Sequence, residues 1–319
     1  MVTQAVVTPR PWISEGRFQD IDAQAAQYEG YGQQYQQISR GPFEGLFNTF
    51  HFGPDLVINF ERANRDLAAT AATPAGRYGA CFLTESSPPC ALNATGFAQE
   101  HVVLTPEHKC VEGKTAAGVS MYCMDVSSSL FPEDGYNMGA VGVLSDPVRM
   151  RELREVVRSG LVAFTTLESP ADYPAAAYAF KASVADILWQ IATRTKEGYM
   201  FGAGRCSTSR AVQVFRRARD YIHHHLPDGI SVVTLCRHLG VSRRSLECVF
   251  RSVIDMGPGS YVRMLQLNRI RRDLMSDADA TLSIGVIAAR HGIWHWSRFS
   301  RYYRQLFGEL PSETRLRLR

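Results

Sequence analysis

The sequence predicts an α+β protein of two domains: a β-rich N-terminal domain with flanking helices and an all-α C-terminal domain. Three observations support this division. The 319 residues exceed one typical domain and suit about two. Short apolar runs separated by turn residues fill the chain up to Val126, whereas helical periodicity begins at Asp146. The basic residues gather in the C-terminal third.

The charge distribution separates the same two parts. Residues 210–319 contain 19 arginines, no lysine and 9 acidic residues, a formal net charge of +10, whereas residues 1–209 carry −6. A basic domain on an acidic one favours a polyanionic partner such as nucleic acid, although a solvated basic surface would have the same composition. The use of arginine without lysine favours bidentate hydrogen bonds from the planar guanidinium group over non-directional charge attraction.

Composition excludes several classes of protein. Hydrophobic residues make up 45% of the chain and charged residues 21%, as in ordinary globular proteins, so neither a disordered chain nor a disulfide scaffold is expected. No apolar run approaches the roughly 20 residues of a membrane helix, and no secretory signal is expected at the start. Seven scattered cysteines without a CxxC pair predict reduced thiols in a cytoplasmic protein without a zinc site.

The N-terminal two thirds begin with a proline-containing arm over residues 1–17. Runs of β-branched and aromatic residues then alternate with glycine and proline turns, which predicts a β-sandwich or a small barrel. The expected strands are residues 43–52, 56–60, 78–83, 101–104 and 119–126.

Two helices are expected after the strands. Asp146-Pro147 supplies an N-cap followed by proline at the first helical position, which starts a helix over 147–163. A second helix covers 175–192. The pair forms a dimer interface or covers the sheet, and the sequence leaves both open. Residues 18–200 thus form one domain, and the glycine- and serine-containing segment 201–210 is a linker.

The first of two helix-turn-helix units is predicted over residues 231–253. Ser231 and Ser242 are N-caps, and Gly240 ends the first helix in the left-handed conformation that glycine favours. Leu246 and Phe250 belong to the apolar stripe of the second helix. Its opposite face presents Arg244, Glu247, Cys248 and Arg251.

The second unit is predicted over residues 282–307. A shift of 53 residues places Phe299 on Leu246 and the outer face of the first unit on Ser297, Ser300, Arg301 and Arg304. A helix over 260–275, roughly 24 Å long at 1.5 Å per residue, separates the two units. It can hold two recognition helices about one DNA turn (~34 Å) apart.

These motifs resemble the AraC/XylS family of transcriptional regulators. The resemblance is carried by Gly240-Val241-Ser242, Ile284 to Ala288, Gly292-Ile293, Phe299 to Arg304, Phe307-Gly308 and Pro311-Ser312. It implies a seven-helix DNA-binding domain over residues 211–316 that reads two adjacent major grooves. It also implies a cupin-like effector and dimerisation domain over residues 18–200.

The resemblance places base-reading positions on both outer faces. In the first unit they are Arg244, Glu247 and Cys248, and in the second they are Trp296, Ser297, Ser300 and Arg301; Arg243, Arg251, Arg298 and Arg304 complete the expected DNA-binding set. Glu247 accepts from a cytosine amine or pairs along its own helix. Trp296 is bulky for this family, and it contacts DNA or packs on the protein itself.

The expected function is therefore that of a sequence-specific, effector-responsive transcriptional activator. Its expected partners are double-stranded DNA, RNA polymerase, an unidentified small-molecule effector and a second copy of the chain, in the cytoplasm and associated with the nucleoid. Glu247 and Ser300 among the arginines disfavour the alternative of a non-specific architectural protein. An enzyme with a DNA-targeting tail is a weaker alternative. Motifs such as GxSxG and HExxH are absent and His51, His101 and His108 are scattered, so no catalytic residue, cofactor or metal is expected.

Overall fold

The computed structural model describes residues 13–92, 95–132, 141–167, 172–194, 210–226, 229–276 and 281–317. The chain divides into two compact units, an N-terminal unit of Met1–Tyr35 with Glu44–Gly204 and a C-terminal unit of Gln36–Phe43 with Arg205–Arg319. Most of the expected arm (residues 1–12) and most of the expected linker (residues 201–209) lie outside the described residues.

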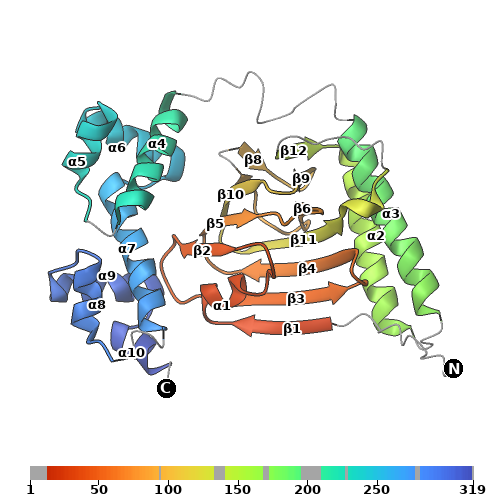
Figure 1. The fold of residues 1–319 in the computed structure, drawn as a ribbon, viewed down its shortest axis with the longest axis horizontal. Coiled ribbons are helices and arrows are strands. Elements are labelled where there is room, and N and C mark those ends of the chain that lie inside the picture. The colour runs from red at the N-terminus through yellow and green to blue at the C-terminus, as the bar shows by residue number, and fades with distance from the viewer. Residues whose placement is uncertain are drawn as a thin grey trace. The chain divides into compact units, whose positions relative to one another are not determined.

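The N-terminal unit contains a seven-stranded antiparallel sheet (Figure 1). Its strands, in spatial order, are β1 (Ile13–Phe18), β3 (Gly45–His51), β4 (Leu56–Ala63), β11 (Val119–Ser127), β6 (Arg77–Leu83), β9 (His101–Thr105) and β12 (Gly142–Ser145). β1 corrects the expected arm over residues 1–17, because every residue of 13–18 has a partner in β3 and the pairing satisfies this backbone.

A five-stranded sheet forms the second layer of this unit. Its order is β2 (Gln34–Gln37), β5 (Leu67–Ala72), β10 (Cys110–Thr115), β7 (Cys90–Leu92) and β8 (Thr95–Phe97). Two short helical turns, α1 (Ile21–Ala25) and η1 (Ser128–Leu130), complete the connections. The β-rich fold expected for this part of the chain is therefore confirmed, with two sheets as its layers.

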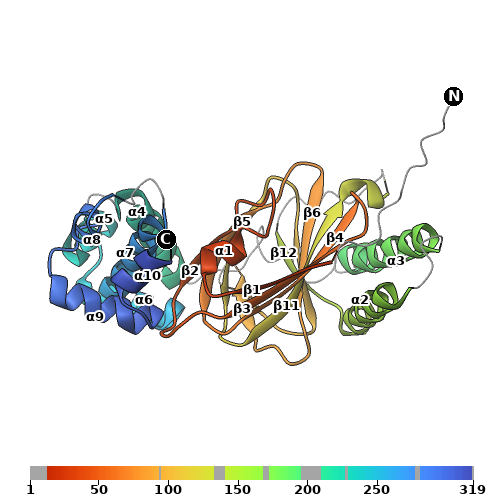
Figure 2. The same cartoon turned by 90° about the horizontal axis from the view of Figure 1, so that it is seen from below.

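Helices α2 (Pro147–Thr166) and α3 (Tyr173–Arg194) cover one face of the seven-stranded sheet (Figure 2). Strand side chains alternate between the two faces of a sheet. Ile58, Phe82 and Val102 therefore point toward the helices, where they share a core with Met150 and Leu188. The helices begin and end close to their expected bounds, and they cover the sheet.

The C-terminal unit is built from helices around one core. They are α4 (Arg210–His225), α5 (Val232–Leu239), α6 (Arg243–Ile254), α7 (Pro258–Leu274), α8 (Ile284–Arg290), α9 (Trp296–Phe307) and α10 (Pro311–Leu316). These seven helices of the described residues confirm the expected all-α fold. In Figure 1, α7 joins α4–α6 at one end to α8–α10 at the other. No helix of the described residues is long and apolar enough to cross a membrane.

Residues 36–43 belong to the C-terminal unit although they precede most of the N-terminal unit in sequence. The backbone of Gln37 exchanges two hydrogen bonds with the buried Asn268 side chain of α7, at 2.9 and 3.1 Å. The amide groups of Gln37 (Nε2, 2.7 Å) and Gly41 (N, 3.0 Å) both donate to the carbonyl of Leu306. This segment therefore adds hydrogen bonds to the end of α9.

Candidate nucleic-acid interface

Local capping sets where α6 begins. Gly240 ends α5 with φ +64°, a conformation that costs other residues energy. The Ser242 hydroxyl then accepts a hydrogen bond from the amide of Ser245 at 3.1 Å and caps the first turn of α6. Leu246 and Phe250 are fully buried, so the opposite side of α6 is left toward solvent.

That outward side of α6 carries the residues expected to contact DNA. Arg243, Arg244, Cys248 and Arg251 are exposed, and Glu247 is half-buried. Glu247 Oε1 lies 3.2 Å from Arg251 Nη2, one turn further along the helix. Glu247 therefore forms the intrahelical pair, and its second oxygen remains available as a hydrogen-bond acceptor.

Helix α9 presents a matching face. Phe299 and Tyr303 are buried. The opposite side carries Trp296, Ser297, Arg298, Arg301 and Arg304, all exposed, with Ser300 half-buried. The Arg301 guanidinium also lies 5.3 Å from the centre of the Tyr302 ring, within cation–π range.

Trp296 combines the two roles that the sequence left open. A Cβ on Gly285 of α8 would lie only 2.9 Å from the edge of the Trp296 ring, so the indole packs closely over that glycine. The side chain is nevertheless 47% exposed, and the neighbouring Trp294 is 70% exposed. One edge of Trp296 is thus held by the protein while the rest faces solvent.

The two helix-turn-helix units are joined rigidly within the C-terminal unit. Helix α7 has 17 residues, which corresponds to roughly 25 Å. Its Gln266 Nε2 donates to the carbonyl of His291 at 2.9 Å, and its Asp273 lies 2.6 Å from the ring of the same histidine. Figure 2 shows α6 and α9 along the same edge of this unit.

A buried ion pair that the sequence did not reveal attaches α10 to α7. The Arg271 guanidinium donates to Glu309, and both residues are at most 9% exposed. Thr314 donates to the same Glu309 carboxylate at 2.7 Å and shares a hydrogen bond with the Tyr303 hydroxyl at 2.8 Å. Burial is the main cause that raises the pKa of Tyr303 to about 12. These hydrogen bonds connect α7, α9 and α10 on the buried side of α9.

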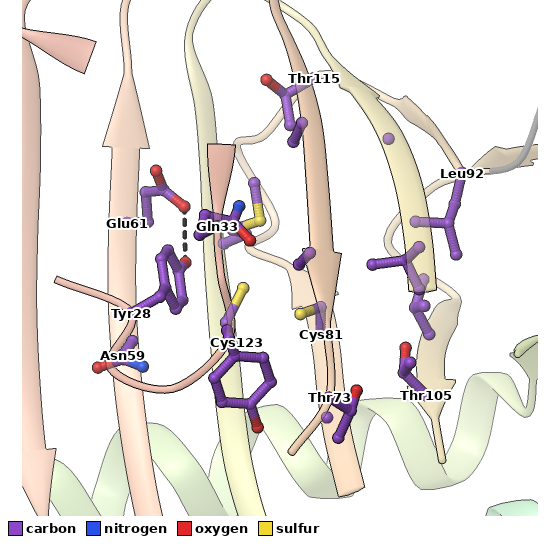
Figure 3. Close-up of a pocket in the computed structure, with 18 of the residues that line it drawn as sticks. Tyr28, Gln33, Asn59, Glu61, Thr73, Cys81, Leu92, Thr105, Thr115 and Cys123 are labelled. Carbon is purple, nitrogen blue, oxygen red and sulfur yellow. Dashed lines mark hydrogen bonds between the residues drawn. The ribbon is translucent and has the colours of Figure 1, made fainter. Parts of the chain in front are cut away.

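The N-terminal unit contains a second candidate site, a cavity between its two sheets (Figure 3). The space between the side chains is about 870 Å³, including solvent at its mouth. Asn59 and Glu61 of β4, Cys81 of β6 and Cys123 of β11 point to this side of the seven-stranded sheet. Sequence reasoning missed this site; the signal that could have found it is the pair Asn59 and Glu61 at alternate positions of β4.

Two helix-turn-helix units with arginine-bearing recognition helices define a DNA-binding protein of the helix-turn-helix class. A family described as "Helix-turn-helix domain" matches residues 235–317. The "XylDLEGF operon transcriptional activator 2" of Pseudomonas putida is 31% identical over 124 residues, which cover 39% of this chain and 79% of that relative. The chain belongs to the AraC/XylS family of transcriptional regulators.

Two further similarities extend the comparison. A "Probable thc operon regulatory protein" of Rhodococcus erythropolis is 33% identical over 31% of this chain and 30% of that relative, so the match spans about a third of its length. The crystal structure of the AraC-like transcriptional activator CuxR matches 70% of this chain and 80% of its own, with 18% identity and a TM-score of 0.39.

Proposed function

We propose that the protein is a sequence-specific DNA-binding transcriptional regulator that inserts α6 and α9 into adjacent major grooves. The single observation that carries this proposal is the pair of exposed, arginine-bearing helix faces connected through α7. A major groove admits an α-helix, and arginine can donate two hydrogen bonds to the edge of a guanine.

The exposed residues divide into two roles. Arg244 and Arg301, with Ser297 and Ser300, are placed to read base edges, and Glu247 accepts from a cytosine amine. Arg243, Arg251, Arg298 and Arg304 contact phosphates and set the register. Cys248 and Trp296 make apolar contacts with bases or sugars.

Regulation follows from the N-terminal unit. We propose that a small effector occupies the cavity between the sheets, that the protein activates transcription by recruiting RNA polymerase, and that a second copy of the chain is a partner. We further propose that the protein is a non-catalytic regulator, and that binding to chromosomal DNA places it in the cytoplasm at the nucleoid.

Selection from random DNA duplexes by the full chain tests this proposal. The expected enriched site has two conserved blocks about one helical turn, or roughly 10 base pairs, apart. Competition between the selected site and random DNA at matched salt should favour the site by at least roughly 1,000-fold. Equal affinity for the selected site and for random DNA would instead indicate a non-specific architectural protein, since phosphate contacts alone carry no sequence information.

A further inference from the structure

Among the polar side chains that line the cavity in the N-terminal unit, Glu61 is a carboxylate, which when ionised only accepts hydrogen bonds. Glu61 is 2% exposed and accepts from Gln24 Nε2 (2.7 Å), the Tyr28 hydroxyl (2.7 Å) and the Tyr35 hydroxyl (2.6 Å). Two of these bonds reach Oε1 and one reaches Oε2, so Oε2 has acceptor capacity left. Asp125 also lines the cavity.

Two further polar side chains in the lining have no partner. Asn59 is 6% exposed and Thr115 is 8% exposed. Within the described part of the chain, neither Asn59 Oδ1 nor Thr115 Oγ1 has a hydrogen-bond partner. A buried polar atom without a partner costs about 1–3 kcal/mol, so both atoms favour a ligand that supplies the missing bonds. Asn59 belongs to β4 of the seven-stranded sheet and Thr115 to β10 of the five-stranded sheet.

No positively charged side chain balances these acceptors inside the cavity. Its described lining contains neither lysine, arginine nor histidine. The Asp125 carboxylate has its own partners, Arg77 at 2.6 Å and the Tyr31 hydroxyl at 2.8 Å, but Glu61 is bonded to neutral groups. Burial raises the pKa of Glu61. Burial thus disfavours the charged carboxylate; a bound cation would offset this cost, whereas an anionic ligand would increase it.

The remaining lining fits an apolar body. Tyr28 and Tyr35 add aromatic rings beside Glu61, and Tyr31 adds one beside Asp125; ring faces attract ammonium groups. Further from Glu61 the surface is aliphatic or aromatic, from Ala69, Ala71, Leu92, Phe97, Val103 and Val111. The polar and apolar parts of the cavity therefore match the two ends of one amphipathic molecule.

We propose that the cavity binds an organic amine, with its ammonium group toward Glu61 and an apolar or aromatic body between the two sheets. This inference rests on the proposed role of the cavity as the effector site and names the chemical class of the effector. The ammonium group donates to the remaining acceptor position of Glu61 Oε2, which already accepts from Tyr28, and the absence of a cation in the described lining disfavours carboxylate ligands of the same shape.

Calorimetry with the full chain at pH 7 compares matched probes. One set is 2-phenylethylamine, 2-phenylethanol and 3-phenylpropanoate, and the other is hexylamine, hexanol and heptanoate. At least one amine is expected to bind 10-fold or more tightly than the alcohol and the acid of its own set. Equal or tighter binding of an acid, or no binding of either amine, would overturn the proposal.

Two glutamine variants test the role of Glu61. Glu61→Gln keeps the shape but removes the charge, and it should weaken amine binding at least 10-fold while leaving alcohol binding unchanged. Glu112→Gln is the matched control, because Glu112 lies on β10 between the lining residues Val111 and Gly113 but is not part of the lining itself. Unchanged amine affinity in Glu61→Gln would contradict the proposal. If that variant does not fold, the calorimetric comparison of amines, alcohols and acids on the wild-type chain still tests the proposal.

DNA site selection is measured without any amine, so the two proposals fail separately. A selected DNA site together with no amine binding would support the proposed regulator and reject the amine as its effector. Amine binding together with non-specific DNA binding would support the amine site and reject the sequence-specific regulator.

Discussion

Glu247 and Arg251 form an ion pair of 3.2 Å on the outward side of α6. Arg251 is exposed and Glu247 is half-buried, with 40% of its side chain accessible, so the pair contributes only about 0.3–0.5 kcal/mol to the stability of the helix. The pair holds the Glu247 carboxylate beside Arg251, and a Cβ added to Gly257 at the start of α7 would also lie 2.6 Å from Glu247 Oε1. Glu247→Gln is expected to relax the preference for cytosine at one position of the first half-site. A carboxylate only accepts hydrogen bonds, whereas the glutamine amide can also donate and therefore no longer selects the cytosine amine. Binding to a set of single-base site variants measures this, with Asp255→Asn as the control; an unchanged base preference would show that the pair is only structural.

Arg244 and Arg301 occupy different positions of the two units: the 53-residue shift pairs Arg244 with Ser297 and Cys248 with Arg301. Alanine at Arg244 or Arg301 should weaken binding to the preferred site by about 1–3 kcal/mol and relax specificity at one base each. The two losses should map to different half-sites. Loss of specificity in the same half-site by both variants would contradict the assignment of one helix to each groove.

Arg304 should behave differently, because it is proposed to contact phosphate. Arg304→Ala is expected to weaken binding to all sequences alike and to reduce the slope of log K against log salt by about 1. Titrations at several salt concentrations on specific and random duplexes measure this slope. A change confined to the specific duplex would place Arg304 among the base-reading residues instead.

Gly240 tests the turn of the first unit. Its φ of +64° is a left-handed conformation, and no atom would crowd an added Cβ, so Gly240→Ala should cost about 1–2 kcal/mol through backbone strain alone. Hydrogen exchange measured on peptides from α5 and α6 detects the loss of stability at this turn. Gly259→Ala is the control: its Cβ would make an ordinary 3.7 Å contact with Val232, and a change within roughly 0.5 kcal/mol is expected. Equal effects of both variants would reject the strain argument.

Glu61 makes the stability of the N-terminal unit depend on pH. Burial raises the pKa of this carboxyl group in the folded state above its unfolded value, so the folded chain binds more protons between the two values. Stability contributed by this group is therefore present at low pH and falls as pH rises through the folded pKa. Glu61→Gln should remove that decrease, measured as Tm against pH beside Glu112→Gln. A decrease that persists in Glu61→Gln would assign it to other groups.

The parts of the structure that the sequence predicted correctly are those set by local interactions. Ser231, Ser242 and Ser283 cap helices within three residues of themselves, and the stripe of Leu246 and Phe250 follows directly from helical spacing. The strands that were missed are short or rich in alanine and polar residues, such as β5 (Leu67–Ala72) and β10, and they form only because the pairing partner is present.

The cavity and the buried ion pair could not be predicted for the same physical reason. Tyr31 and Asp125 are 94 residues apart in sequence, and Arg271 and Glu309 are 38 apart. Such contacts depend on which strands and helices become neighbours in the fold. The local sequence pattern does not predict which elements these are. The expected strand over residues 56–60 ended one residue before Glu61. Its three donors come from α1, from the loop after α1 and from β2.

The central claim is that α6 and α9 enter two successive major grooves on one side of the duplex. Methylation protection of guanine N7 on the selected site tests this most directly, since N7 lies in the major groove. The account predicts two protected clusters about one helical turn apart, with Arg244→Ala removing protection in one and Arg301→Ala in the other. A single protected cluster, or protection on opposite sides of the duplex, would contradict it.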